Sequence, residues 1–127
     1  MKKIITTQNA PKPIGPYNQA VLVDNTLYLS GQIGLNPHSM RLVKGGVKKE
    51  TKQVMENLKS VLQAAEMDFD QVVKSSIFLS NMLDFEIVNE VYASYFNNET
   101  APARETIAVK TLPKNVRVEI SMIATKQ

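Results

Sequence analysis

The stretch Ala101-Pro102-Ala103-Arg104-Glu105-Thr106-Ile107-Ala108-Val109 leads from a loop into an apolar strand, and a single arginine lies near its start. Proline has no N–H for a strand ladder and keeps the preceding residue extended, so Pro102 marks the beginning of the strand. Alternation predicts that Arg104 and Thr106 share one face of the strand and that Glu105 lies on the other. Arg104 therefore has two interpretations, a planar fork of donors for a carboxylate or a surface arginine in an ordinary ion pair.

Residue periodicity outside this stretch predicts five more strands and two helices. The expected strands cover residues 2–6, 17–23, 27–33, 72–79 and 116–124, and the expected helices cover residues 47–65 and 85–96, the second with Asp84 as its N-cap. Turn residues at 24–25 and 112–115 predict two hairpins, one of them between the strands 101–109 and 116–124. We expect an α+β fold, with a mixed sheet of about six strands and both helices packed on one face.

Length and composition favour a single domain, residues 1–127, with a core of its own. Of the 127 residues, 43% are hydrophobic and 21% are charged, as in ordinary globular proteins. Cysteine is absent, which excludes disulfides, a thiolate nucleophile and cysteine-bound metals. His38 is the only histidine and lies beside a proline, so neither a histidine metal cluster nor a Ser-His-Asp triad is expected.

The charge of the chain is modest, with 15 basic and 12 acidic residues and a net charge of +3. The lysines are scattered rather than clustered with aromatic residues, so a nucleic-acid partner is not expected. The N-terminal lysines are not followed by the long apolar segment of a signal peptide, and no run approaches the length of a membrane span. We therefore expect a cytoplasmic protein.

Three separated motifs carry the most specific pattern in the chain. They are Gly15-Pro16-Tyr17-Asn18-Gln19-Ala20, Ser30-Gly31-Gln32 and Pro102-Ala103-Arg104, and Leu112-Pro113-Lys114 and Val118-Glu119-Ile120 follow them. In this order they resemble the signature segments of the reactive intermediate deaminase A (RidA) family, also called the YjgF family. Each motif is weak alone, but their joint occurrence at these spacings covers nearly the whole chain.

The resemblance implies a chorismate-mutase-like α+β fold and a homotrimer whose active clefts lie between subunits. The implied reaction is hydrolysis of 2-aminoacrylate-type enamines and imines to 2-oxoacids and ammonia, the activity of a 2-iminobutanoate/2-iminopropanoate deaminase. Members of the family use neither a cofactor nor a metal, which agrees with the missing cysteines and the single histidine. The small-molecule partner would be an imine or a 2-oxoacid.

Two residues match the catalytic positions of the family. Arg104 matches the arginine that binds the substrate carboxylate, a role that suits its planar fork. Glu119 matches the acidic residue that places the attacking water, although an exposed strand glutamate is the alternative. A protonated imine is already electrophilic, so a held carboxylate and an oriented water can supply much of the acceleration.

Further residues match substrate-binding positions alongside Arg104, and they are Tyr17, Ser30, Gly31, Asn89 and Thr106. Tyr17 would hydrogen-bond the substrate or a water molecule, or pack as a buried aromatic residue. Gly31 could offer its N–H to a carboxylate oxygen, with Ser30 beside it in the cleft wall. Asn89 would line the cleft or cap contacts between subunits, and Thr106 occupies a position that often carries cysteine in relatives.

Two other functions compete with the deaminase, a 2-oxoacid-binding regulatory module and an RNA-binding or ribonuclease-like translation inhibitor. Glu119 argues against a pure carboxylate sensor, because an anion beside the ligand weakens its binding. The scattered lysines argue against RNA. One subunit would have difficulty turning Arg104, Glu119 and Asn89 towards a single point, so we expect a neighbouring subunit to close the cleft. Small residues such as Thr106 and Ala108 would suit that contact.

Overall fold

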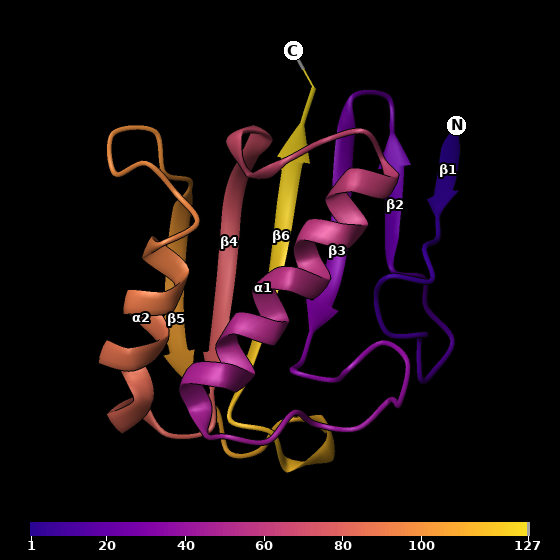
Figure 1. Cartoon of the computed structure of the whole chain (residues 1–127). Helices are drawn as coiled ribbons and strands as arrows, with labels where there is room; N and C mark the ends of the chain where they lie inside the picture. The colour runs from indigo at the N-terminus through magenta and orange to yellow at the C-terminus, as the bar shows by residue number, and fades with distance from the viewer. Residues whose placement is uncertain (127) are drawn as a thin grey trace.

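A six-stranded sheet with two helices on one face makes up the computed structural model, which describes residues 1–126 (Figure 1). The strands are β1 (Lys2–Ile5), β2 (Ala20–Val23), β3 (Thr26–Gln32), β4 (Val72–Leu79), β5 (Ala103–Ala108) and β6 (Val118–Thr125). Their order across the sheet is β1-β2-β3-β6-β4-β5, in which β4 and β5 are parallel and every other neighbouring pair is antiparallel. The expected α+β fold with a mixed sheet is confirmed.

The helices α1 (Val47–Ala64) and α2 (Phe85–Ala93) bury their apolar stripes against the sheet. The stripe of α1 follows the predicted three- and four-residue spacing and is completely buried at Val54, Met55, Leu58, Val61 and Leu62. Short 3-10 turns, η1 (Phe69–Gln71), η2 (Met82–Asp84) and η3 (Pro113–Asn115), link the larger elements. No helix within residues 1–126 combines the length and the apolar character of a membrane span.

The start of α2 differs in one detail from the expected N-cap. Asp84 precedes the helix, as expected, but its side chain makes no capping hydrogen bond. Its carboxylate instead accepts hydrogen bonds from Nε and Nη2 of Arg117, at 3.0 and 2.6 Å. A bidentate ion pair to the guanidinium is stronger than a bond to a helix N–H, so the pair ties α2 to the start of β6.

The expected hairpin between the last two strands is wrong, because β6 lies between β3 and β4 while β5 pairs with β4. Burial explains the difference. Every second side chain of β6 is buried, which suits a central strand, whereas no side chain of β5 is fully buried, which suits an edge. Residues 109–117 cross the end of β4, where Val109 donates to the Leu79 carbonyl and Ser80 donates to the Arg117 carbonyl.

The two faces of the sheet have different surroundings. The face towards α1 and α2 forms the core, whereas no helix within residues 1–126 covers the other face (Figure 1). We call the second face the open face, and the register of β3 to β6 assigns to it Tyr28, Phe78, Glu105, Ile107, Glu119 and Ile123. Tyr28 is 50% exposed and Ile107 is 45% exposed, so large apolar side chains lie on the surface here.

Candidate active site

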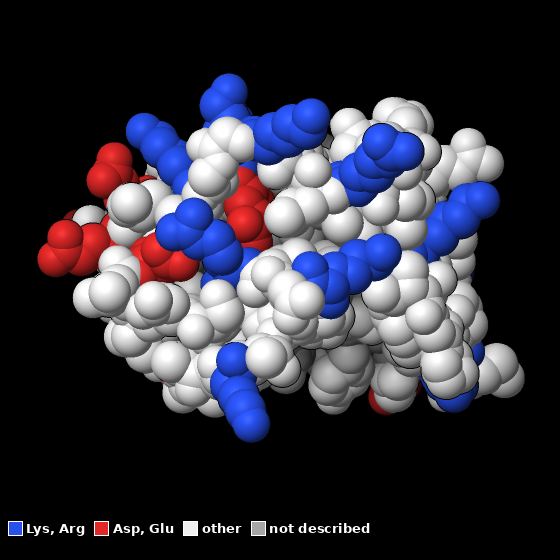
Figure 2. All heavy atoms as spheres, turned by 90° about the horizontal axis from the view of Figure 1, so that it is seen from below, with Lys and Arg blue, Asp and Glu red and all other residues white. Residues whose placement is uncertain are grey.

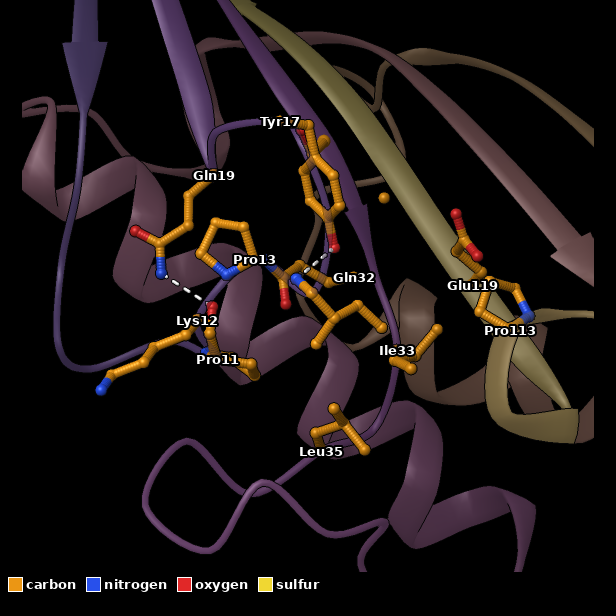
Figure 3. Close-up of a pocket in the computed structure, with 13 residues that line it drawn as sticks. Pro11, Lys12, Pro13, Tyr17, Gln19, Gln32, Ile33, Leu35, Pro113 and Glu119 are labelled. Carbon is orange, nitrogen blue, oxygen red and sulfur yellow. Dashed lines mark hydrogen bonds between the residues drawn. The ribbon is translucent and has the colours of Figure 1, made fainter.

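A pocket of about 360 Å³ opens where a proline-rich loop, residues 10–16, meets β3 and β6. We call these residues the proline loop. The apolar part of the lining comes from Pro11, Pro13, Ile14, Ile33, Leu35 and Pro113. In Figure 3 the proline loop lies on one side of the pocket, and Glu119 lies on the other. Four of the predicted site residues, Tyr17, Ser30, Gly31 and Glu119, line this single pocket.

Glu119 reaches the pocket from β6 and lies half-buried against Gly31 of β3. A Cβ atom on Gly31 would lie 2.9 Å from the Glu119 carboxyl carbon, so the carboxylate occupies the space that a side chain would need. Burial raises the pKa of Glu119, and among the described residues no hydrogen bond or cation opposes the shift. The residue is therefore not an exposed strand glutamate, and its carboxylate is suited to accept a proton from water.

Tyr17 and Ser30 supply the hydroxyl groups of the pocket. Tyr17 is 45% exposed rather than buried, and its hydroxyl oxygen accepts a hydrogen bond from the Ile14 N–H at 3.3 Å (Figure 3). Because that bond uses only a lone pair, the Tyr17 O–H can still donate to a ligand. The Ser30 Oγ donates to the Asn18 carbonyl at 2.6 Å, so Ser30 fixes the wall of the pocket.

Arg104 lies outside this pocket, in a group with Phe85, Asn89 and Tyr92 of α2 that we call the arginine cluster. Its Nη1 donates to the Asn89 Oδ1 at 2.8 Å. Its guanidinium carbon lies 5.1 Å from the centre of the Tyr92 ring and 5.9 Å from the centre of the Phe85 ring. These contacts fix the plane of the guanidinium and leave other N–H groups for a ligand. Asn89 therefore orients Arg104.

The neighbours of Arg104 along β5 divide between the two faces of the sheet. Glu105, on the open face, forms an ion pair with Lys74 and accepts a hydrogen bond from Ser76, so it does not neutralise Arg104. Thr106 is on the helix side, about 7 Å further along the strand than Arg104. The Thr106 Oγ1 is buried and has no hydrogen-bond partner among the described residues. Such orphan hydroxyls are rare, so this atom is available to a polar ligand atom or a water molecule.

The pocket and the arginine cluster lie on opposite faces of one sheet. Glu119 is on the open face, whereas Arg104 contacts α2 on the helix side. Arg104 is level with Ser75 of β4, Ser75 is level with Met122 of β6, and Glu119 is three residues from Met122. Two strand spacings and three residues put the Cα atoms of Arg104 and Glu119 roughly 14 Å apart. A single chain therefore does not bring the two predicted catalytic residues together.

Sequence reasoning missed part of each group. Helical spacing predicts that Phe85 and Tyr92 are buried, but it gives no sign that they flank a guanidinium. The density of prolines predicts a stiff loop at residues 9–16, but it does not predict that this loop forms a pocket wall. No group of three His, Asp or Glu side chains within residues 1–126 is arranged to hold a metal ion.

The comparisons with known proteins agree in family. A family model described as endoribonuclease L-PSP matches residues 7–126. The 2-iminobutanoate/2-iminopropanoate deaminase of Mus musculus is 50% identical over 126 residues, which cover 99% of this chain and 93% of the mouse protein. A RutC family protein of Pyrococcus horikoshii is 48% identical over 127 residues, which cover 100% of both chains.

Solved structures agree in fold. A putative endoribonuclease of Thermotoga maritima has a TM-score of 0.96 at 46% identity, with 100% of this chain and 99% of that chain covered. RidA from the Antarctic bacterium Psychrobacter has a TM-score of 0.93 at 40% identity, with 98% and 99% covered. TdcF of E. coli, with bound serine, has a TM-score of 0.92 at 35% identity, with 98% and 99% covered.

Fold and site together define a small α+β protein that carries a half-buried carboxylate in a pocket and an oriented arginine on the other face of its sheet. The chain belongs to the RidA family, the same family as the endoribonuclease L-PSP model and the RutC relatives. The family membership and the chorismate-mutase-like fold expected from the sequence motifs are confirmed.

Proposed function

We propose that the protein hydrolyses 2-iminobutanoate and 2-iminopropanoate to 2-oxoacids and ammonia. The observation that carries the proposal is a pair of complementary groups, the oriented guanidinium of Arg104 and the half-buried carboxylate of Glu119. A 2-imino acid has an anionic carboxylate next to an electrophilic carbon, and these two groups suit the two features. The mouse relative, 50% identical to this chain, carries this activity in its name.

The proposed site is completed between subunits of a homotrimer, with Arg104 of one subunit facing the pocket of its neighbour. The separation of Arg104 and Glu119 by roughly 14 Å, on opposite faces, supports this arrangement. So does the position of β5 at the edge of the sheet, which puts Arg104 at the border of the subunit. A closed ring repeats one head-to-tail contact without leaving an open end, and it would cover the exposed Tyr28 and Ile107 of the open face.

The proposed chemistry uses the two catalytic residues in turn. Arg104 holds the substrate carboxylate, and the Gly31 N–H adds a second donor. Glu119 orients a water molecule towards the carbon of the protonated imine. As the C–O bond forms, the C=N double bond becomes a single bond and a proton of the water passes to Glu119. Glu119 then returns this proton to the nitrogen of the tetrahedral carbinolamine. The C–N bond breaks, ammonia leaves, and the remaining hydroxyl proton is released to solvent as the 2-oxoacid carbonyl forms.

A coupled assay tests the proposal. A pyridoxal-phosphate dehydratase releases the imine, and 2-oxoacid formation is followed with and without the protein. The protein is expected to raise the rate above that of spontaneous hydrolysis, and Glu119→Gln is the matched control that keeps the side-chain shape but cannot accept a proton. If calorimetry shows that the protein binds 2-oxobutanoate while hydrolysis stays at the spontaneous rate, the regulatory module is correct and the deaminase proposal fails.

RNA is not the proposed substrate, although the matching family model is named after an endoribonuclease. On the face shown in Figure 2, Lys and Arg side chains are spread over the whole face and most of the acidic side chains gather at one side. A track for nucleic acid needs adjoining basic groups and aromatic residues for stacking.

We propose a cytoplasmic location, because short-lived imines must be hydrolysed in the compartment where they are released.

A further inference from the structure

We propose that two buried amides, Gln19 and Asn57, are positioning residues that hold the two backbone walls of the pocket in place for catalysis. The inference rests on the proposed function, since it concerns how the same pocket is kept in shape. Neither side chain is among the groups assigned to the reaction. Gln19 is only 3% exposed and Asn57 is completely buried, so both amides depend on protein partners for their hydrogen bonds.

Gln19 holds the proline loop. The two hydrogens of its Nε2 are shared among the carbonyls of Thr7, Ala10 and Pro11, at 3.0, 3.2 and 2.9 Å, and its Oε1 accepts from the Thr7 N–H at 2.7 Å. The bond to Pro11 is drawn in Figure 3. Prolines have no N–H, so the loop cannot build a backbone ladder of its own. The amide of Gln19 therefore replaces the missing ladder and fixes the wall that carries Ile14 against Tyr17.

Asn57 holds the second wall, where the chain leaves β3. Its Nδ2 donates to the carbonyls of Ile33 and Leu35, at 3.1 and 3.0 Å. Its Oδ1 accepts from the Gln53 Nε2 at 2.8 Å, which satisfies the remaining side of the amide. Both Ile33 and Leu35 line the pocket. An α1 side chain therefore fixes a stretch of backbone that lies just beyond Gly31, the residue packed on Glu119.

An amide is the group that suits both positions, because each wall offers buried carbonyls that need N–H donors. An apolar side chain of the same shape would leave these carbonyls unpaired. A carboxylate would place negative charge against these carbonyls, and it has no hydrogen to donate to them unless it is protonated. Displacement of a positioning group by about 1 Å can slow an enzyme by roughly a hundredfold. The geometry of both walls is therefore expected to control turnover.

The isosteric variants Gln19→Glu and Asn57→Asp test the proposal through their pH dependence. Burial raises the pKa of a carboxyl group, so each new side chain is a carboxylate facing carbonyls only at high pH, and at about pH 9.5 kcat/KM is expected to fall roughly tenfold or more relative to the wild type. At about pH 5.5 the buried carboxyl group is increasingly protonated and recovers one donor, so the ratio to the wild type is expected to recover. Glu50 and Glu119 titrate in both proteins, so the ratio removes their effect.

Matched controls separate positioning from general destabilisation. Thr51→Val removes a buried hydroxyl on α1 that bonds only the Val47 carbonyl of the same helix, and it is expected to keep wild-type kcat/KM. The folded fraction is measured by circular dichroism at each pH, and rates are expressed per folded molecule. Gln19→Met and Asn57→Leu carry no charge, and they are expected to lose activity equally at both values of pH.

The outcomes distinguish the positioning role from the proposed function. The positioning role is overturned if Gln19→Glu and Asn57→Asp keep wild-type kcat/KM at about pH 9.5, or if Thr51→Val loses as much activity as they do. If the wild type itself shows no deaminase activity, the proposed function fails. In that case the affinity for 2-oxobutanoate, measured by calorimetry, replaces kcat/KM as the readout. The positioning role is then overturned if Gln19→Glu and Asn57→Asp bind 2-oxobutanoate as tightly as the wild type at the higher pH.

Discussion

Mixing two inactive variants tests whether the site lies between subunits. Arg104→Ala removes the guanidinium, and Glu119→Gln removes the proton acceptor, while each variant keeps the residue that the other lacks. Loss of a charged hydrogen bond removes about 1.5–3 kcal/mol, which slows turnover roughly ten- to a hundredfold. Each variant alone is therefore expected to have at most about a tenth of the wild-type activity.

A mixed ring restores some sites, and the size of the recovery follows from the geometry. A site between subunits is intact only where a subunit that keeps Arg104 faces a subunit that keeps Glu119. Random assembly of an equal mixture gives mixed trimers in about three quarters of cases, and each has one intact site in three. The mixture is therefore expected to reach about a quarter of the wild-type activity.

The measurement needs exchange of subunits before the assay. The two variants are unfolded together in urea, refolded, and assayed with the coupled dehydratase, and the mass is checked by sedimentation equilibrium. The same two proteins, mixed without unfolding, serve as the control and are expected to show the mean of the two separate activities. If the refolded mixture is a trimer and is no more active than this mean, the two residues act within one chain and the proposed site between subunits is wrong.

Four more substitutions test single features. Arg104→Lys keeps the charge but loses the planar fork, so kcat/KM is expected to fall about tenfold or more with unchanged circular dichroism; near-native turnover would contradict carboxylate capture by two N–H groups. Gly31→Ala forces the Glu119 carboxylate from its place, and turnover is expected to fall at least about tenfold, whereas an unchanged rate would show that the close contact is unimportant. Ile107→Glu puts a charge on the open face and is expected to lower assembly and activity together, which a fully active monomer in sedimentation would contradict. Burial raises the pKa of Glu50, so this residue stabilises the fold below its ordinary pKa and loses that contribution as pH rises through the raised value. Gln does not titrate, so Glu50→Gln does not lose stability in this way. Urea unfolding over a pH series should show that the free energy of unfolding of the variant increases relative to that of the wild type as pH rises.

Much of the fold is predictable because periodicity is a local property of the chain. The stripe of α1 and the alternation of β6 identify the core directly. The pairing of strands is not local, and proximity along the chain wrongly favours a hairpin between β5 and β6. The alternating apolar residues of β6 predict one buried face, but alternation alone does not tell a central strand from an edge strand.

The candidate site is predictable in its residue types but not in its geometry. The motifs single out Arg104 and Glu119, and alternation separates Arg104 from Glu105. Neither motif nor alternation tells which face of β5 turns towards the helices, because β5 is an edge strand on which no side chain is fully buried. The arginine cluster and the pocket therefore become two separate groups only when the register across β4 is known.

The placement of Arg104 and Glu119 on opposite faces has a consequence for how the activity would depend on the amount of protein. In the proposed ring, a newly made subunit is inactive until it assembles with others, so the number of active sites depends on the total concentration of the protein. Specific activity would fall on dilution below the dissociation constant of the assembly, and recover on concentration, without any change in the subunit itself. A cell that makes little of this protein would then gain disproportionately little protection from reactive imines.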